Sequence, residues 1–243
     1  QSLIAPEHRN RSLDIDALSM NMDGTFDDHN NDLEAYRDVY AAAVEYTTRK
    51  VAAFCEAVGD DTAIIVTSDH GEQLDDVADE RRFGHITPDM SEQLLHVPLV
   101  VVNADLSVDE SASVSHLDLG NLVTSLATGD EFEPAAPIAA EVAGMGVAHP
   151  PTNHEAFSYW NRNSRCVYLN DGESKYVWDS LGTARHYERV DEAYVLQEEG
   201  SHDLVPSATN QLFQTPIKKV DSGRGSTEID SLVESQLEEL GYI

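Results

Sequence analysis

The chain has 243 residues, with 45 Asp or Glu against 15 Lys or Arg, so its formal net charge at pH 7 is −30. This composition excludes nucleic acid as a partner, because binding its phosphates requires clustered Lys and Arg. No run of about 18 or more apolar residues is present, so the sequence predicts no membrane span.

The acidic residues are spread along the chain, which is typical of a protein from a high-salt environment and not of an acidic interaction tail. The Debye length is about 10 Å at about 0.1 M salt and about 3 Å at about 1 M, so concentrated salt screens the self-repulsion of such a surface. We therefore expect a halophilic-type protein, and the composition favours the cytoplasm of a salt-loaded organism. The oligomeric state stays open.

A long amphipathic helix is the first predicted element. Residues 32–58 carry apolar side chains near helical spacing, and Asp32 is a suitable N-cap. The apolar positions are Leu33, Tyr36, Val39, Tyr40, Val44, Val51, Phe54 and Val58. We expect this helix to pack beside a sheet.

The next element is an apolar strand that runs into an acid and an imidazole. Residues 63–73 read Ala-Ile-Ile-Val-Thr-Ser-Asp-His-Gly-Glu-Gln. Neighbouring side chains of a continuing strand point to opposite faces, so Asp69 and His70 can share one ion only if the strand stops first, and Gly71 permits the bend. The carboxylate and imidazole suit Ca, Mg, Mn or Zn. The alternative is an Asp that caps the next helix and a solvent-facing His.

Two further blocks follow in order. Residues 83–86 read Phe-Gly-His-Ile, and residues 91–102 read Ser-Glu-Gln-Leu-Leu-His-Val-Pro-Leu-Val-Val-Val. Together with residues 67–72 they resemble the sulfatase branch of the alkaline-phosphatase superfamily. Its members carry a strand ending in Asp-His-Gly-Glu or Asp-Asn-Gly, a nearby Gly-His-Gly or Gly-Lys, and a helix leading into His-Val-Pro and an apolar strand.

The resemblance implies a metal-dependent hydrolase of sulfate monoesters, in which Asp69 and His70 hold part of a divalent ion, most simply calcium. His85 would take the place of the group that contacts the transferred group or the leaving oxygen; the alternative is a turn histidine in a loop. Glu72 would support a metal ligand or be exposed to solvent. His96 is interpreted first as a helix-end residue and second as a residue lining the site. The substrate would be an anionic sulfate or phosphate ester.

The family's nucleophile, a Cys or Ser in a Cys/Ser-X-Pro/Ala-X-Arg stretch, has no counterpart in this chain. Cys55 and Cys166 lie in a predicted helix and strand, and we expect both to be small buried apolar residues. The chain begins at Gln1, so we expect the carboxyl-terminal portion of a longer protein that is inactive and poorly folded alone. The alternatives are a phosphoester or phosphonate hydrolase or phosphoglycerol-type transferase of the same superfamily, and a non-catalytic metal-binding remnant.

The remaining elements change from helical to alternating patterns. Residues 114–126 predict a short helix that stops at Gly129, and the segments 133–141 and 221–227 are interpreted as linkers. Alternation over residues 165–169 and 174–178, separated by Asn-Asp-Gly, predicts a hairpin. A second alternating run covers residues 184–196, and residues 227–240 predict a terminal helix.

The fold class expected from these elements is α/β. We predict a mixed, largely parallel sheet flanked by helices, alkaline-phosphatase-like with its amino-terminal part missing, plus a small C-terminal antiparallel sheet and a terminal helix. Residues 1–145 would form the second half of the sulfatase-like α/β domain, and residues 146–243 a smaller α+β subdomain.

The charge of −30 predicts salt-dependent stability. Because molar salt screens repulsion between surface carboxylates, the melting temperature should be clearly higher in molar KCl than in dilute buffer. Thermal unfolding followed by circular dichroism in the two buffers checks this, and equal melting temperatures would contradict the halophilic interpretation.

Overall fold

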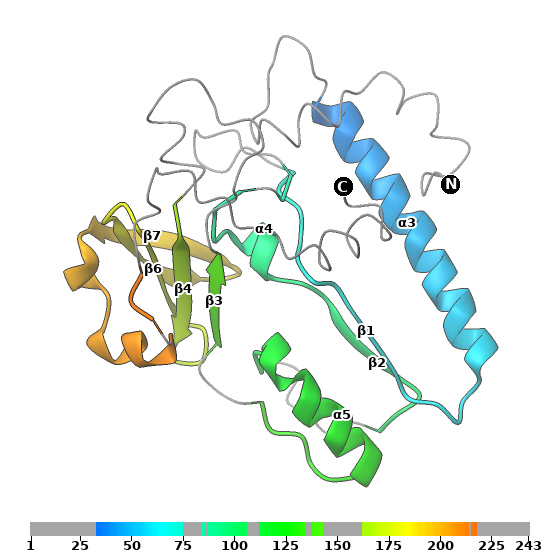
Figure 1. The fold of residues 1–243 in the computed structure, drawn as a ribbon. Helices are drawn as coiled ribbons and strands as arrows, with labels where there is room; N and C mark the ends of the chain where they lie inside the picture. Colours follow the sequence, from blue (N-terminus) through cyan, green and yellow to red (C-terminus); the bar gives the residue numbers. More distant parts are fainter. Residues whose placement is uncertain are drawn as a thin grey trace, which may run out of the picture.

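The computed structural model describes residues 33–74, 84–85, 87–105, 112–134, 138–142, 162–213 and 215–217. Its helices are α3 (Leu33–Val58), α4 (Glu92–Leu95) and α5 (Leu119–Thr128), with the 3-10 helices η2 (His116–Asp118), η3 (His202–Leu204) and η4 (Ser207–Leu212). Its strands are β1 (Ile64–Thr67), β2 (Leu99–Val102), β3 (Ile138–Val142), β4 (Ser164–Leu169), β5 (Ser174–Asp179), β6 (Ala184–Val190) and β7 (Ala193–Gly200). Figure 1 shows the five-stranded sheet on one side of α4 and the long helix α3 on the other.

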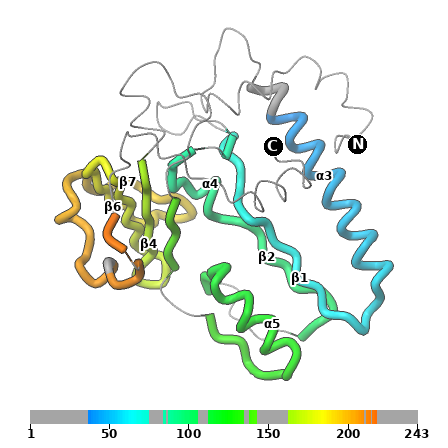
Figure 2. The backbone as a smooth tube through the Cα atoms, in the orientation of Figure 1, coloured from blue at the N-terminus to red at the C-terminus, as the bar shows by residue number. Residues whose placement is uncertain are grey.

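The first sheet corrects the expected fold class, because its strands are antiparallel and not parallel. β1 pairs with β2 so that Thr67 lies opposite Leu99 and Ile64 opposite Val102. A parallel partner needs a crossover that carries the chain back along the strand. The connection between the strands, residues 68–98, is long enough for such a crossover, so its length alone does not decide between the two directions. The backbone instead returns to β2 from the end at which β1 finished (Figure 2).

The second sheet is an antiparallel meander in the order β3-β4-β5-β6-β7. The predicted hairpin is β4 and β5, and its turn residues Asn170, Asp171 and Gly172 have φ of 54°, 56° and 85°. The predicted run over residues 184–196 is divided into β6 and β7 by a turn in which Asp191 has φ 57°. The buried core comprises Val167, Trp178, Ala184 and Val205. The predicted antiparallel C-terminal sheet is therefore present, with one more strand before it.

That additional strand is β3, and it corrects the interpretation of residues 133–141 as a linker. Ile138–Val142 pairs along its whole length with β4. The sequence Ile-Ala-Ala-Glu-Val, with a β-branched residue at each end, forms this edge strand although the Pro/Ala composition around it is typical of a linker. The domain boundary at residue 145 stays a prediction.

Helix α3 matches the predicted amphipathic helix in position. Ala42 is buried, and Arg37 Nε donates to Leu74 O at 2.8 Å, so the helix contacts the segment that follows β1. Its apolar face is incompletely covered by the described residues, since Phe54 is 60% exposed. No helix among the described residues is long and apolar enough to cross a membrane.

Several expectations fall outside the described residues: the Asp32 cap, the segment 221–227 and the terminal helix 227–240. The two cysteines are inside them, and both are free. Cys166 is fully buried, as expected, whereas Cys55 is only partly buried. Burial raises the pKa of the Cys166 thiol to about 11. This cysteine is therefore a packing residue and not a nucleophile.

A buried lysine joins the second sheet to α4. Lys175 of β5 is 4% exposed, and its ammonium pairs with the Glu92 carboxylate and donates to Met90 O at 2.5 Å. The hydroxyl of Tyr168 donates to the same Glu92 oxygen at 2.7 Å. Burial raises the pKa of Tyr168, and the neighbouring negative charges act in the same direction. These contacts hold α4 against the second sheet. They therefore also fix the position of any residues that pack on α4.

Lys175→Met should lower the free energy of unfolding by about 2 kcal/mol, a value reduced for solvent screening because the Glu92 carboxylate that loses its cation is 35% exposed. Lys50→Met on the exposed surface of α3 is the matched control and should change stability by less than about 0.5 kcal/mol. Chemical denaturation in molar KCl measures both. The double variant Lys175→Met/Glu92→Leu should recover most of the loss, since no unpaired charge remains. Equal losses in the Lys175 and Lys50 variants would contradict this role.

Candidate active site

The acid and imidazole at the end of β1 point toward each other. The strand ends at Thr67, and Asp69 Oδ2 lies 3.7 Å from His70 Nε2. The His70 N–H donates to Asp69 Oδ1 at 3.0 Å, and Ser68 Oγ donates to His70 O at 2.6 Å. The Asp69 side chain is 87% exposed and that of His70 is 46% exposed. The turn therefore presents both side chains on one side, where solvent or a ligand can reach them.

The electrostatics prepare this pair to act as ligands. The His70 backbone N–H, and after it the charge of the His70 ring, lower the pKa of Asp69, so the carboxylate is ionised at neutral pH. The ring nitrogen Nδ1 of His70 lies 2.9 Å from Gly71 O. A carbonyl oxygen only accepts, so Nδ1 carries the proton in this contact, and in the neutral ring the lone pair would be on Nε2. An ionised carboxylate and a neutral ring of this tautomer are the forms in which these two side chains bind a divalent cation.

Glycine at position 71 is required by a close approach and not by the bend that the sequence suggested. Its φ does not lie in the left-handed region. A Cβ built on Gly71 would instead lie 1.9 Å from Gln93 O, and the Gly71 N–H donates to Leu94 O at 2.9 Å. The backbone after Asp69 and His70 is therefore packed directly on α4.

A second histidine joins the pair through a backbone bridge. Gln73 and Gly84 exchange two hydrogen bonds of 3.1 and 2.9 Å. His85, which follows Gly84, stacks on His70 with ring centroids 4.5 Å apart and planes at 30°. Its Nδ1 lies 2.6 Å from Glu72 Oε2. The structure thus brings Asp69, His70, Glu72 and His85 into one group, although Glu72 contacts His85 and not the predicted metal ligand.

His96 is not brought into this group. It follows α4 as its C-cap, where its N–H donates to Glu92 O at 2.9 Å, and the residue is exposed. Among the described residues, we find no hydrogen bond or ion pair between its side chain and the other site residues. The geometry corresponds to the interpretation as a helix-end residue. Arg81 and Arg82, which could draw in an anionic substrate, lie outside the described residues.

Two neighbours of the site were not expected from the sequence. Thr67 Oγ1 and His116 Nε2 are 3.4 Å apart, which places η2 at the end of β1. The pKa of Tyr40 on α3 is raised by burial and next by the negative charge of Glu72, so this tyrosine lies near the group. The one sequence signal for His116 was the pair Ser115 and Asp118, which forms a capping box that begins η2 beside His116.

In the part of the chain that the structure describes, no group of three or more His, Cys, Asp or Glu side chains is arranged to hold a metal. Asp69 and His70 supply two donors of suitable type, and atoms 3.7 Å apart are compatible with a common ion at about 2.1 to 2.4 Å from each. A hard cation such as calcium takes about six to eight oxygen ligands. The donor set therefore fits a divalent ion in kind and is incomplete in number.

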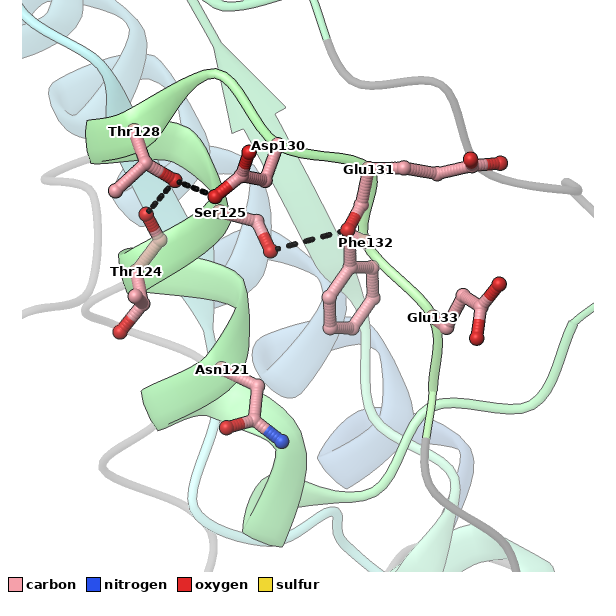
Figure 3. A pocket seen from close by; sticks show the side chains of 8 residues that line it. All are labelled: Asn121, Thr124, Ser125, Thr128, Asp130, Glu131, Phe132 and Glu133. Atoms are coloured by element: carbon pink, nitrogen blue, oxygen red, sulfur yellow. Dashed lines mark hydrogen bonds between the residues drawn. The ribbon is translucent and has the colours of Figure 1, made fainter.

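A separate open pocket of about 310 Å³ lies along α5 and the segment after it. Figure 3 shows its wall, where Thr128 donates to Asp130 at 2.7 Å and Ser125 faces Glu131. It contains none of Asp69, His70, Glu72 and His85.

Comparison with protein families then bears on the group around Asp69. Residues 14–129 match the family model described as Sulfatase. The chain is similar to this family over that segment, which is just under half of its length. The match includes β1, α4, β2 and all four grouped residues, so the resemblance deduced from the three motifs is confirmed. No curated protein and no solved structure gives a significant match. The sulfatase match supports hydrolase chemistry of that family in general terms.

Gly71→Ala should destabilise the fold by at least about 2 kcal/mol, since the new methyl group would overlap the Gln93 carbonyl and displace the segment from α4. Gly120→Ala on α5 is the control, because nothing lies within 4 Å of its Cβ position. It should stabilise the helix by up to about 1 kcal/mol. Urea unfolding of the two variants gives the comparison. Equal stability of the Gly71 variant and the wild type would show that this close approach does not exist.

Proposed function

We propose that this chain contributes the Asp69 and His70 ligands of a divalent cation in a sulfatase-type hydrolase of sulfate monoesters, with calcium as the first choice of ion. The observation that carries the proposal is the 3.7 Å approach of Asp69 Oδ2 to His70 Nε2 just after β1, inside the segment that matches the sulfatase family. A mixed oxygen and nitrogen donor set without thiolate is also compatible with Mg, Mn or Zn.

The charge of the substrate explains why a cation would be needed. A sulfate monoester is anionic, and hydrolysis requires stabilisation of its non-bridging oxygens and of the leaving oxygen. A bound divalent ion would supply positive charge to those oxygens. The protein itself, at a net charge of −30, provides a repulsive background, so a local source of positive charge has to be held at a defined place.

We assign His85 to the reacting oxygens of the substrate. Its ring is stacked on His70, which places it beside the proposed ligand pair, and its side chain is 40% exposed, so an ester can reach it. An imidazole can accept or donate a proton near neutral pH. In this role His85 would give a proton to the leaving oxygen or hold it by a hydrogen bond.

The nucleophile and the remaining ligands would come from outside the described residues. Cys166 is buried in the second sheet, and Cys55 lies on α3, so neither is a member of the group around Asp69. Two protein ligands hold a hard cation only weakly. The proposal therefore assigns the 243 residues alone weak metal binding and no hydrolysis, and assigns catalysis to the protein in its full natural length.

In that full-length protein, Asp69→Asn should reduce hydrolysis of an aryl sulfate at least about 100-fold, since the substitution removes the charge that holds the ion. Asp60→Asn, in the turn before β1, is the matched control and should retain activity. Initial rates with an aryl sulfate and the corresponding aryl phosphate provide the measurement. A protein that cleaves only the phosphate would overturn the sulfate assignment, and unchanged activity in the Asp69 variant would overturn the ligand assignment.

A further inference from the structure

We propose that Glu72 is a positioning residue for His85: it holds the imidazole in the tautomer protonated at Nδ1 and thereby reserves Nε2 for the reacting oxygens. The reaction part of this inference rests on the proposed function. The tautomer part concerns only residues of this chain and can be tested without substrate.

The first support is the hydrogen bond itself. Glu72 Oε2 and His85 Nδ1 lie 2.6 Å apart, and the Glu72 side chain is only 10% exposed. An ionised carboxylate has no proton to donate, so Nδ1 must carry the proton in this contact. The bond is charge-assisted and short, which is the stronger class of hydrogen bond. Nε2 is consequently the nitrogen left for other partners.

The backbone pairing of Gln73 with Gly84 fixes the contact between Glu72 and His85. Gln73 and Gly84 form an antiparallel bridge with two backbone hydrogen bonds, so the residues one step outward on each side, Glu72 and His85, lie opposite each other. Directly opposed side chains on one face are close enough to interact. Gly84 has φ 83°, a conformation that favours glycine and turns the chain into His85.

The neighbouring imidazole of His70 has a different acceptor from that of His85. His70 already uses its Nδ1 on Gly71 O at 2.9 Å, so it needs no carboxylate to set its tautomer. The two rings are stacked at 4.5 Å, each with Nδ1 engaged by an acceptor of its own. The role of Glu72 as support for a metal ligand or as a solvent-exposed residue stays a prediction, and the ion pair that its carboxylate makes in this structure is with His85.

The proton balance of this arrangement is simple. A neutral His85 with Nδ1 protonated accepts at Nε2 the proton released by the attacking hydroxyl group or water, and it becomes an imidazolium whose Nδ1–H still faces the Glu72 carboxylate. The imidazolium then returns the Nε2 proton to a leaving oxygen. The carboxylate stabilises the cation throughout and exchanges no proton, which is the logic by which a carboxylate orients an imidazole in a catalytic triad.

The test is nitrogen NMR of the full-length protein with ¹⁵N-labelled histidine, in the wild type, Glu72→Gln and Glu72→Ala. The wild type should show His85 protonated at Nδ1. Glu72→Ala should shift His85 toward the tautomer protonated at Nε2, and Glu72→Gln, which keeps an accepting oxygen, should lie between the two. Glu45→Gln, on the exposed surface of α3, should leave the His85 signals unchanged. A wild-type His85 protonated at Nε2, or a tautomer unaffected by Glu72→Ala, would overturn the inference.

Kinetics of the same proteins separate the inference from the function on which it rests. With an aryl sulfate, Glu72→Ala should lower kcat by about 10- to 100-fold with little change in KM, because the reacting nitrogen is misoriented while the substrate contacts remain. An active wild type with unchanged kcat in Glu72→Ala would overturn the positioning role. An inactive wild type with the expected tautomer would overturn the proposed function and leave the Glu72–His85 assignment supported.

Discussion

The contact on which the site depends is the packing of the Gly71 backbone against α4. Its N–H donates to Leu94 O, and the absence of a Cβ lets the chain approach the Gln93 carbonyl. Helix α4 is in turn held by Lys175 and Tyr168 of the second sheet through Glu92. A short series of buried polar contacts therefore connects β4 and β5 with the turn that carries Asp69 and His70. A four-residue helix has little stability of its own, so its position is determined by these contacts.

The distribution of charge explains why the site would need a cation. Several basic side chains among the described residues are used in ion pairs within the fold, such as Arg162 with Asp89, Arg165 with Glu141 and Arg185 with Glu199. These basic side chains therefore neutralise carboxylates within the fold of a strongly acidic protein. A sulfate ester would approach against the overall field, and a held cation together with a correctly oriented imidazole would reverse that field locally. The proposed function and the Glu72–His85 contact describe two parts of this local reversal.

The sequence predicted the elements with clear local signals. The helical spacing of α3, the Asn-Asp-Gly turn between β4 and β5 and the Gly129 stop of α5 are all present. Strand direction was predicted wrongly, because an apolar run such as residues 99–102 has the same composition in a parallel and an antiparallel pair, and only the path between the strands decides. Strand β3 was missed because its Pro/Ala context is typical of a linker.

The candidate site was predictable to a similar degree. The ordered motifs identified Asp69, His70 and His85, since these residues are marked by their place next to strand ends and glycines. The partner of Glu72 could not be predicted from local sequence, because it depends on the bridge between Gln73 and Gly84, which are not neighbours in the sequence. The same holds for Thr67 and His116, which are 49 positions apart. The reason for Gly71 was also nonlocal, since it depends on the Gln93 carbonyl of a later helix.

Calcium titration of the 243-residue chain by calorimetry tests the central claim most directly. Two ligands predict weak binding, with a dissociation constant on the order of 1 mM. This binding should disappear in both Asp69→Asn and His70→Ala and persist in Asp60→Asn. Equal affinity in the wild type and the Asp69 and His70 variants would show that the cation binds elsewhere on the acidic surface and would contradict the account.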